Sequence, residues 1–129
     1  MSILNGMVKL LLKERLKNID YFLAHPHDAQ HRTFNYLIRK ATNTEWGNRY
    51  DYASISSPKT FKERIPIQDY DDVKPYIDRI LKGEQNILWD TPIRWLAKSS
   101  GTTSDKSKFI PVSKESLEDN HYRGGKDIM

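Results

Sequence analysis

Apolar residues near the N-terminus recur every three or four positions, with charged or polar residues between them. The apolar positions are Leu4, Val8, Leu11, Leu12, Leu16, Ile19 and Leu23. This spacing predicts an amphipathic helix from about residue 3 to residue 24, which Pro26 ends. We expect the apolar stripe to pack on the protein's own core. A helix that lies on a membrane surface or on a partner is the alternative.

A second helical pattern follows the first. Its apolar face consists of Phe34, Leu37, Ile38 and Ala41. We expect Gly47 to end this second helix, because glycine is common just after a helix end. The two helices together make residues 1–50 a helical region. Residues 51–60 are expected to form a connector, since three serines and Pro58 interrupt regular structure there.

Helices are expected again over residues 61–83, beginning with a short turn at Thr60–Arg64. Asp69 suits the N-cap of the next helix, and the two aspartates after Tyr70 would complement its dipole. Pro75 lacks an amide hydrogen, so we expect a break there and a second helical piece from Pro75 to Lys82. Gly83 supplies the C-terminal stop.

The last third of the chain predicts a strand–loop–strand unit over residues 93–112. Ile93–Ala97 and Lys108–Val112 are rich in bulky, β-favouring residues, and a polar loop separates them. Ser113 is a suitable cap for a helix that runs from Lys114 into the 120s. Nothing after this helix resembles the end of a domain, so we expect the chain to be the beginning of a longer protein.

Composition narrows this picture only a little. The 129 residues are 37% hydrophobic and 29% charged, with a formal net charge of +4, which suits one small globular domain. The chain has no cysteine, which excludes disulfides, thiolate chemistry and cysteine-ligated zinc. The aliphatic run at residues 10–12 is far too short for a signal peptide or a membrane span, so the cytoplasm is the expected location.

The polar loop between the two expected strands has the composition of a phosphate-binding loop. Residues 98–113 read KSSGTTSDKSKFIPVS, and phosphate oxygens accept hydrogen bonds from hydroxyls, lysines and the amides of a glycine turn. The donors are Ser99, Ser100, Gly101, Thr102, Thr103, Lys106 and Lys108. An ordinary polar turn has a similar composition, so composition alone leaves both interpretations open.

A P-loop is excluded by the residues around this stretch. Residues 101–107 approach its spacing but lack the second glycine before the lysine. The motif also requires a helix directly after the loop, whereas a β-prone run with a proline follows here, at 109–112.

A different family matches the loop and the segments before it. The run from Ser99 to Thr103, with Lys108 seven residues after Gly101, is similar to the SSGT-(S/T)-x-G-x-x-K loop of the auxin-responsive acyl-acid amido synthetase family. Upstream, IPIQDYDDVKPYIDRILKGE at 65–84 resembles that family's VPxxxYEDxKPYIxRIxxGE segment. Residues 44–47, TEWG, are similar to its T-x-(F/W)-G motif, so the resemblance covers roughly residues 40–113.

The resemblance implies the N-terminal part of an adenylate-forming ligase. Its fold would be the beginning of a large α/β domain, mainly helical here, with a β-hairpin around the phosphate loop. Its reaction would use ATP and Mg²⁺ to convert a carboxylic acid to an acyl-adenylate and pyrophosphate, and an amino acid would then displace AMP. The remaining C-terminal part of the enzyme would be a further partner, and this chain alone is expected to have no turnover.

The resemblance also implies roles for the loop residues in binding ATP phosphates. The hydroxyls of Ser99, Ser100, Thr102 and Thr103 would bind the β- and γ-phosphates, Gly101 would allow close approach, and Lys108 would compensate charge. No catalytic residue and no protein-bound metal is assigned. Asp105 stands where the family has its second glycine, and an aspartate beside a triphosphate is unfavourable unless its carboxylate points outward or reaches the metal.

Other candidate residues favour structural roles. The clustered histidines are His25, His27 and His31, which we interpret as a solvated helix connection rather than a metal site. The carboxylates Asp69, Asp71 and Asp72 are explained by helix capping.

The aromatic residues Trp89, Trp95 and Tyr76 have apolar neighbours and are expected in the core rather than on a base-stacking surface. No binding of nucleic acid or membrane is therefore expected. The alternative to a ligase fragment is a small, mostly helical interaction module whose polar loop is not catalytic.

Overall fold

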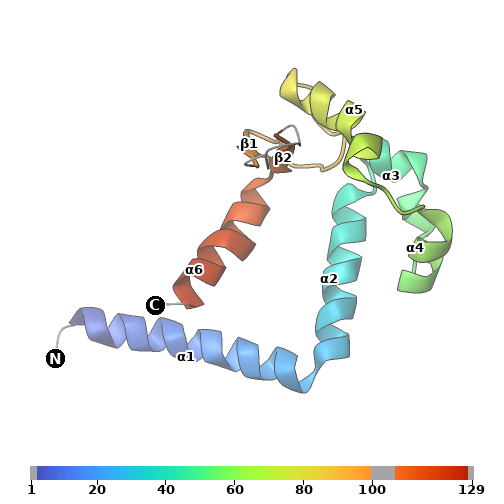
Figure 1. The fold of residues 1–129 in the computed structure, drawn as a ribbon. Coiled ribbons are helices and arrows are strands. Elements are labelled where there is room, and N and C mark those ends of the chain that lie inside the picture. Colours follow the sequence, from blue (N-terminus) through green and yellow to red (C-terminus); the bar gives the residue numbers. More distant parts are fainter. Residues whose placement is uncertain (1–2, 100–106, 128–129) are drawn as a thin grey trace. The chain divides into compact units, whose positions relative to one another are not determined.

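The computed structural model describes residues 3–99 and 107–127 and is mainly helical, with one two-stranded antiparallel sheet (Figure 1). The chain divides into two compact units, Met1–Leu37 and Ile38–Met129. Within the described ranges, no helix combines the length and the apolarity that crossing a membrane requires. The predicted mixture of helices and one strand pair is confirmed.

The first unit contains α1, Ile3–Ala24, and most of α2, Pro26–Ala41. The helix expected over about 3–24 is therefore present. Pro26 opens α2 directly, because proline suits the first helical position, where its missing amide hydrogen costs nothing. His27 and His31 consequently lie in a helix, so the prediction of a solvated loop connection is wrong for these two histidines.

Two leucines of the apolar stripe of α1 are exposed, Leu16 at 57% and Leu23 at 66%. That the stripe packs on the protein's own core stays a prediction. Near the end of α1, the Tyr21 ring has two neighbours: the guanidinium of Arg32 on α2 lies 4.9 Å from its centre, and the His25 ring lies 4.8 Å from it at a tilt of 40°. These contacts join the end of α1 to the start of α2 within the first unit.

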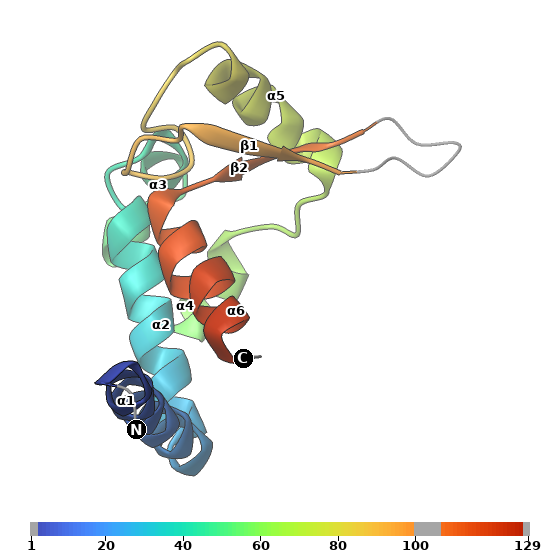
Figure 2. The ribbon, with the colours of Figure 1, turned by 90° about the vertical axis from the view of Figure 1, so that its left-hand side faces the viewer.

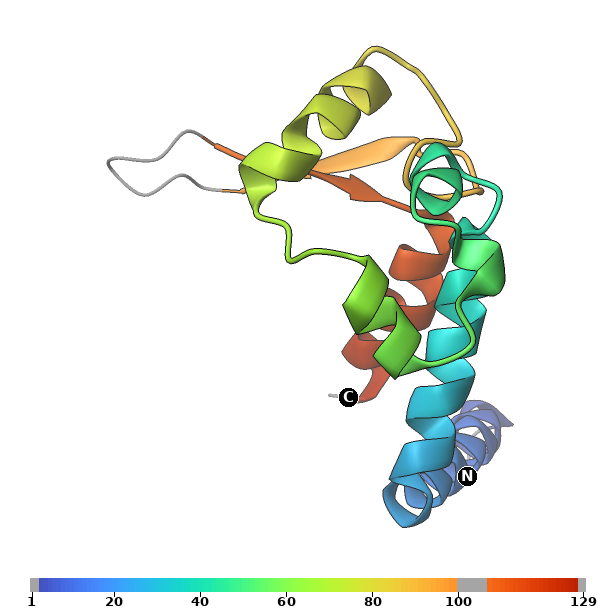
Figure 3. The same cartoon turned by 90° about the vertical axis from the view of Figure 1, so that its right-hand side faces the viewer.

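The second unit carries the core and most of the secondary structure. After the end of α2 its elements are α3 (Glu45–Arg49), η1 (Tyr52–Ser54), α4 (Pro58–Arg64), α5 (Tyr70–Leu81), β1 (Trp95–Lys98), β2 (Phe109–Val112), η2 (Ser116–Tyr122) and α6 (Arg123–Asp127). Its buried apolar residues are Ile38, Ala41, Tyr52, Ile55, Ile77, Ile80 and Ile87. Figure 3 shows α3 and α4 within this unit.

The expected connector at 51–60 is shorter than predicted. The 3-10 turn η1 lies inside it, and α4 begins at Pro58 and not at Thr60. Ser57 is the N-cap, because its hydroxyl oxygen accepts a hydrogen bond from the amide of Thr60 at 3.1 Å. A proline at the first helical position completes this start.

Gly47 does not close a helix but lies inside α3. A Cβ atom at this position would lie 1.9 Å from the carbonyl oxygen of Ala41 and 2.8 Å from that of Thr42. The glycine is therefore required by the close approach of two backbone segments, which no helix-stop rule could indicate.

Helix α5 is continuous, so the predicted break at Pro75 is wrong. The predicted N-cap is confirmed: Asp69 accepts hydrogen bonds from the amides of Asp71 and Asp72, and Asp72 accepts one from Asp69 in return. Pro75 removes only one helical hydrogen bond, the one to the carbonyl of the exposed Asp71. The buried Ile77 and Ile80 hold the second half of the helix in place.

The end of α5 has the geometry that a glycine stop predicts. Gly83 has a φ of +95°. Its amide donates to the carbonyl of Ile80 at 2.9 Å, and the amide of Glu84 donates to that of Arg79 at 3.1 Å. These two bonds form a Schellman motif, which satisfies carbonyls at the end of the helix.

Strands β1 and β2 form an antiparallel hairpin in which Lys98 pairs with Phe109 and Trp95 with Val112 (Figure 2). The first strand begins at Trp95 rather than at the predicted Ile93. The reason is Gln85, whose side-chain amide accepts from the Ile93 amide at 2.8 Å and donates to its carbonyl at 3.2 Å. These bonds occupy the backbone groups that a strand would need.

Trp95 is 48% exposed, so its predicted place in the core is wrong. The strand β1 pairs with another strand on one side only, and three of its four residues are exposed. After β2, the hydroxyl of Ser113 accepts from the amide of Ser116 at 3.1 Å and caps the last helix as predicted. This helix widens into π-helical turns at η2 before it continues as α6.

Candidate functional site

The described ends of the polar loop, Ser99 and Lys108, meet at the loop end of the hairpin, just after β1 and just before β2. The amide of Ser99 donates to the carbonyl of Lys108 at 2.9 Å, and the amide of Lys108 donates to the hydroxyl oxygen of Ser99 at 3.0 Å. The other expected phosphate-binding residues lie outside the described residues: Ser100, Gly101, Thr102 and Thr103. The structure thus brings together the first and the last residue of the expected site.

The Ser99 hydroxyl can both accept and donate a hydrogen bond in this arrangement. Because its oxygen already accepts the Lys108 amide, its own hydrogen points elsewhere and can be donated. Directly after Lys108 the chain continues as β2. The prediction that no helix follows the loop is confirmed, and with it the exclusion of a P-loop.

Two lysines and two aromatic rings lie at this loop end of the hairpin. The ammonium of Lys108 lies 5.3 Å from the centre of the Tyr70 ring, and that of Lys98 lies 5.9 Å from the centre of the Phe109 ring. Tyr70 is the first residue of α5, and α5 contacts β2. We call Ser99, Lys108, Phe109 and Tyr70 the hairpin base.

A polar cluster anchors the opposite end of the hairpin. Lys40, at the end of α2, lies 2.7 Å from a carboxylate oxygen of Asp90 and 3.5 Å from one of Glu115, the residue next to Lys114 in the last helix. Burial opposes ionisation of Glu115, but hydrogen bonds from Thr91, from its own backbone and from Ser113 outweigh it and lower its pKa to about 2. The cluster joins α2, the 88–92 segment and the last helix.

A second cluster explains the motifs upstream of the loop. Thr44 is fully buried; its hydroxyl donates to the carbonyl of Ala41 at 2.7 Å and accepts from the amide of Gly47 at 3.0 Å. The first two amides of α3, those of Glu45 and Trp46, donate to the carbonyls of Asn86 and Ile87. The α3 helix is thus fixed to the segment that follows α5.

Arg79 closes this second cluster from α5. Its guanidinium makes a bidentate pair with Glu45 at 2.7 and 2.8 Å and a further contact with Glu84 at 2.7 Å. The hydrogen bond from Arg79 lowers the pKa of Glu45. We call Thr44, Glu45, Gly47, Arg79 and Glu84 the α3–α5 brace, and each of them belongs to one of the two upstream motifs.

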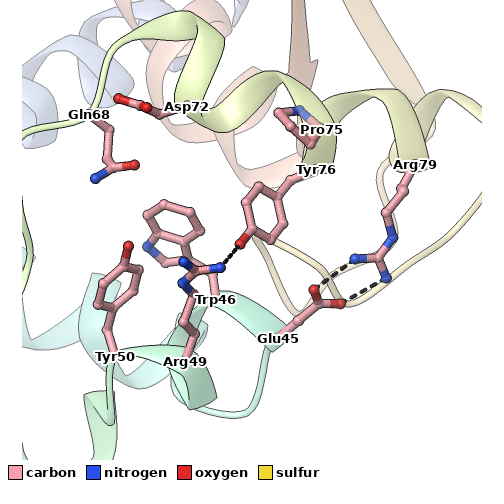
Figure 4. Close-up of a pocket in the computed structure, with 9 residues that line it drawn as sticks. All are labelled: Glu45, Trp46, Arg49, Tyr50, Gln68, Asp72, Pro75, Tyr76 and Arg79. Carbon is pink, nitrogen blue, oxygen red and sulfur yellow. Dashed lines mark hydrogen bonds and ion pairs between the residues drawn. The ribbon is translucent and has the colours of Figure 1, made fainter.

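A cleft between α3 and α5 lies beside this brace (Figure 4). Its lining residues are Glu45, Trp46, Arg49, Tyr50, Gln68, Asp72, Pro75, Tyr76 and Arg79. The Trp46 ring lies between those of Tyr50 and Tyr76, and Arg49 donates to the Tyr76 hydroxyl. Because Arg79 already pairs with Glu45 and Arg49 with the Tyr76 hydroxyl, and none of the lining residues belongs to the polar loop, we assign no ligand to the cleft.

The carboxylates at 69, 71 and 72 serve the α5 start, as capping predicted. Across residues 3–99 and 107–127, no group of three acidic, histidine or cysteine side chains is arranged to hold a metal ion. Tyr70 and Glu115 are the residues near the hairpin to which sequence reasoning gave no role. Tyr70 stands inside the upstream motif, which is the one signal that could have marked it.

Comparison with known proteins places these motifs in one family. A family model described as the GH3 family N-terminal domain matches residues 15–127. The indole-3-acetic acid-amido synthetase GH3.2 of Arabidopsis thaliana is 34% identical over 104 residues, which cover 80% of this chain and 19% of the relative. The jasmonoyl–L-amino acid synthetase JAR6 of Nicotiana attenuata is 36% identical over 90 residues, 69% of this chain and 16% of the relative.

Solved structures give the same result. The structure of GH3.15 acyl acid amido synthetase superposes with a TM-score of 0.76 at 27% identity and covers 86% of this chain and 20% of that one. A second structure, of the same synthetase in complex with 2,4-DB, has a TM-score of 0.63 at 30% identity, over 72% of this chain and 16% of that one. The chain therefore spans about a fifth of the length of the proteins it matches.

Proposed function

The chain belongs to the GH3 family, and from that premise we propose that it supplies the ATP phosphate-binding loop of an acyl-acid amido synthetase. The similar proteins are named as an indole-3-acetic acid-amido synthetase and a jasmonoyl–L-amino acid synthetase. The complete enzyme would be an acid–amino acid ligase whose substrates are a small carboxylic acid and an amino acid. ATP, bound with Mg²⁺, would supply the adenylyl group that activates the carboxylate.

The observation that carries this proposal is the pairing of Ser99 with Lys108 at the loop end of the hairpin. A hydroxyl with a donatable hydrogen and an ammonium then come from the residue just after β1 and the residue just before β2. This donor set fits a phosphate group, which accepts charge-assisted hydrogen bonds from both. Ser99 and Lys108 would bind the β- and γ-phosphates together with Ser100, Thr102 and Thr103, with Gly101 allowing close approach.

The fold supports the role of a fixed platform. Antiparallel pairing fixes the separation of the two strand ends, and the Lys40–Glu115 cluster anchors the opposite end of the same hairpin. Binding groups held by rigid elements lose less freedom when a ligand binds. The hairpin therefore suits the positioning of a flexible triphosphate.

The test is the binding of Mg–ATP and of tripolyphosphate to the 129-residue chain by calorimetric titration. In Lys108→Ala we expect Kd to rise about tenfold for both probes, because one charge-assisted contact contributes on the order of 1.5 kcal/mol. Lys114→Ala is the matched control, since this exposed lysine pairs only at 3.7 Å with Glu118 on the last helix. Equal affinities of the wild type and Lys108→Ala would remove Lys108 from the site.

Binding and turnover are separate expectations. We expect no ATP–pyrophosphate exchange above background from this chain alone, because the acid pocket and the mobile C-terminal domain that the family resemblance implies come later in a complete enzyme. In a complete enzyme that contains this region, Lys108→Ala should raise the KM for ATP or lower the rate of adenylation. Exchange catalysed by the 129-residue chain would contradict the first expectation.

A further inference from the structure

The outer edge of β2 is closed by a side chain at the position next to Lys108. In an antiparallel pair, residues alternate between those whose backbone groups face the partner strand and those whose groups face away. Ser99 and Lys108 face one another. Phe109, the next residue, therefore turns its amide and carbonyl away from β1, toward the open edge of the hairpin.

The hydroxyl of Tyr70 meets both of these outward groups. It accepts a hydrogen bond from the Phe109 amide at 2.9 Å and lies 3.4 Å from the Phe109 carbonyl oxygen, to which it donates. A third strand would offer the same two interactions, so one phenol takes the place of a neighbouring strand. The start of β2 is thereby tied to the first residue of α5.

The ring of Tyr70 acts on Lys108 as well. The ammonium lies 5.3 Å from the ring centre, within the range of a cation–π contact. One side chain thus fixes the backbone beside Lys108 through its hydroxyl and restrains the charged group through its ring. Both contacts lie within the second unit and among described residues.

The position of Tyr70 is itself fixed. The capping box of Asp69 and Asp72 determines the backbone at the start of α5, with hydrogen bonds of 2.8 to 3.1 Å around residues 69–72. Tyr70 is half-buried, and α5 is anchored by the buried Ile77 and Ile80. The side chain that meets the hairpin therefore projects from a rigid element.

We propose that Tyr70 is a positioning residue that holds Lys108 in the place and orientation required to bind a phosphate group. The inference rests on the proposed phosphate-binding role of Lys108 and deepens it. The Tyr70 side chain acts through its hydroxyl and through its ring, and two substitutions distinguish these contributions. Tyr70→Phe deletes the hydroxyl and keeps the ring, and Tyr70→Leu deletes both.

The first measurement uses NMR of the 129-residue chain without nucleotide. In both variants we expect the Phe109 amide to exchange with solvent at least tenfold faster, because its partner is gone. The side-chain ε-protons of Lys108 should show an upfield ring-current shift that Tyr70→Phe retains and Tyr70→Leu loses. Tyr76→Phe, which removes a hydroxyl from the same helix at the Arg49 contact, should change neither signal.

The second measurement is titration with Mg–ATP and with tripolyphosphate. We expect Kd to rise two- to threefold in Tyr70→Phe and about fivefold in Tyr70→Leu, toward the tenfold rise expected for Lys108→Ala. The double variant Tyr70→Leu/Lys108→Ala should bind no more weakly than Lys108→Ala alone, because Tyr70 acts through the lysine. Purely structural damage would instead add to the loss.

The outcomes separate the inference from the proposed function. If Lys108→Ala weakens binding and Tyr70→Leu does not, Tyr70 is no positioning residue and the proposed function stands. If Lys108→Ala leaves binding unchanged, or the wild-type chain binds neither probe, the proposed function fails and the inference fails with it. An unchanged Phe109 amide in Tyr70→Phe overturns the inference regardless of nucleotide.

Discussion

The α3–α5 brace and the hairpin base both contain residues of the family's motifs, but only the brace has buried residues at its centre, Thr44 and Gly47. In the brace, Thr44 is fully buried, and a backbone carbonyl lies where a side chain of residue 47 would begin. In the hairpin base, Ser99, Lys108 and Tyr70 are half-buried, and the neighbouring Ile110 is 52% exposed. Motif residues of one family therefore differ in their surroundings: those at the centre of the brace pack the scaffold, and those of the hairpin base are only half-buried.

This difference teaches how to interpret the motifs of such a family. The T-x-W-G and R-x-x-x-x-E positions are explained by contacts inside the protein, because Thr44 and Arg79 find all of their named partners there. Ser99 and Lys108 lie where the polar loop leaves β1 and enters β2, and under the proposed function their side chains would bind a ligand. Substitutions should therefore affect stability in the brace and binding in the hairpin base.

The largest effect is expected from Gly47→Ala in the brace. Alanine favours a helix by about 1 kcal/mol over glycine, but the new methyl group would lie 1.9 Å from a backbone carbonyl oxygen. Because backbone cannot move aside as a flexible side chain can, we expect a net loss of about 3 kcal/mol of unfolding free energy. Urea unfolding measures it, and stability equal to or above that of the wild type would contradict the close approach.

A matched pair of isoleucine-to-threonine changes sharpens the comparison. Ile80 in α5 is 5% exposed, so Ile80→Thr should cost about 2 to 3 kcal/mol through lost apolar contact and a buried hydroxyl. Ile110→Thr on β2 keeps a β-branched residue at a half-exposed position and should cost less than about 0.5 kcal/mol. Equal losses of unfolding free energy in the two variants would contradict the difference in packing between α5 and the hairpin.

An effect smaller than those of Gly47→Ala and Ile80→Thr is expected from Glu115→Gln, and it should depend on pH. The folded state lowers the pKa of this carboxyl from 4.5 to about 2, so its ionised form stabilises the protein above pH 4.5. That contribution is lost as the pH falls from about 4.5 to about 2. At pH 7 the variant should be about 1 kcal/mol less stable than the wild type.

Thermal unfolding at pH 7, 4 and 2.5 measures this dependence. The difference between the wild type and Glu115→Gln should shrink steadily across that series. Glu118→Gln is a suitable control, because this exposed residue pairs with Lys114 on the same helix. A difference that stays constant with pH would show that Glu115 contributes by shape and not by charge.

Local patterns in the sequence predicted the elements whose cause is local. The α5 cap at Asp69, the stop at Gly83 and the Ser113 cap depend on bonds between residues at most five positions apart, so they can be recognised from sequence. The same reasoning predicted strands on both sides of the polar loop. The predicted helix break at Pro75 was wrong, because the prediction considered only the missing amide hydrogen and not the burial of Ile77 and Ile80 in the folded protein.

The sequence by itself determined the helical start of the chain, the caps, the strand pair around the loop and the family, since each depends on the order of neighbouring residues. Only the tertiary structure decided why Gly47 has no side chain, why β1 begins at Trp95, and which residue meets Lys108. Each of these features depends on a contact between residues from different segments: 47 with 41, 93 with 85, and 70 with 108 and 109. Such contacts arise where separate elements pack together, and the physical reason is that no local pattern of hydrophobicity or turn chemistry records which distant backbone comes near.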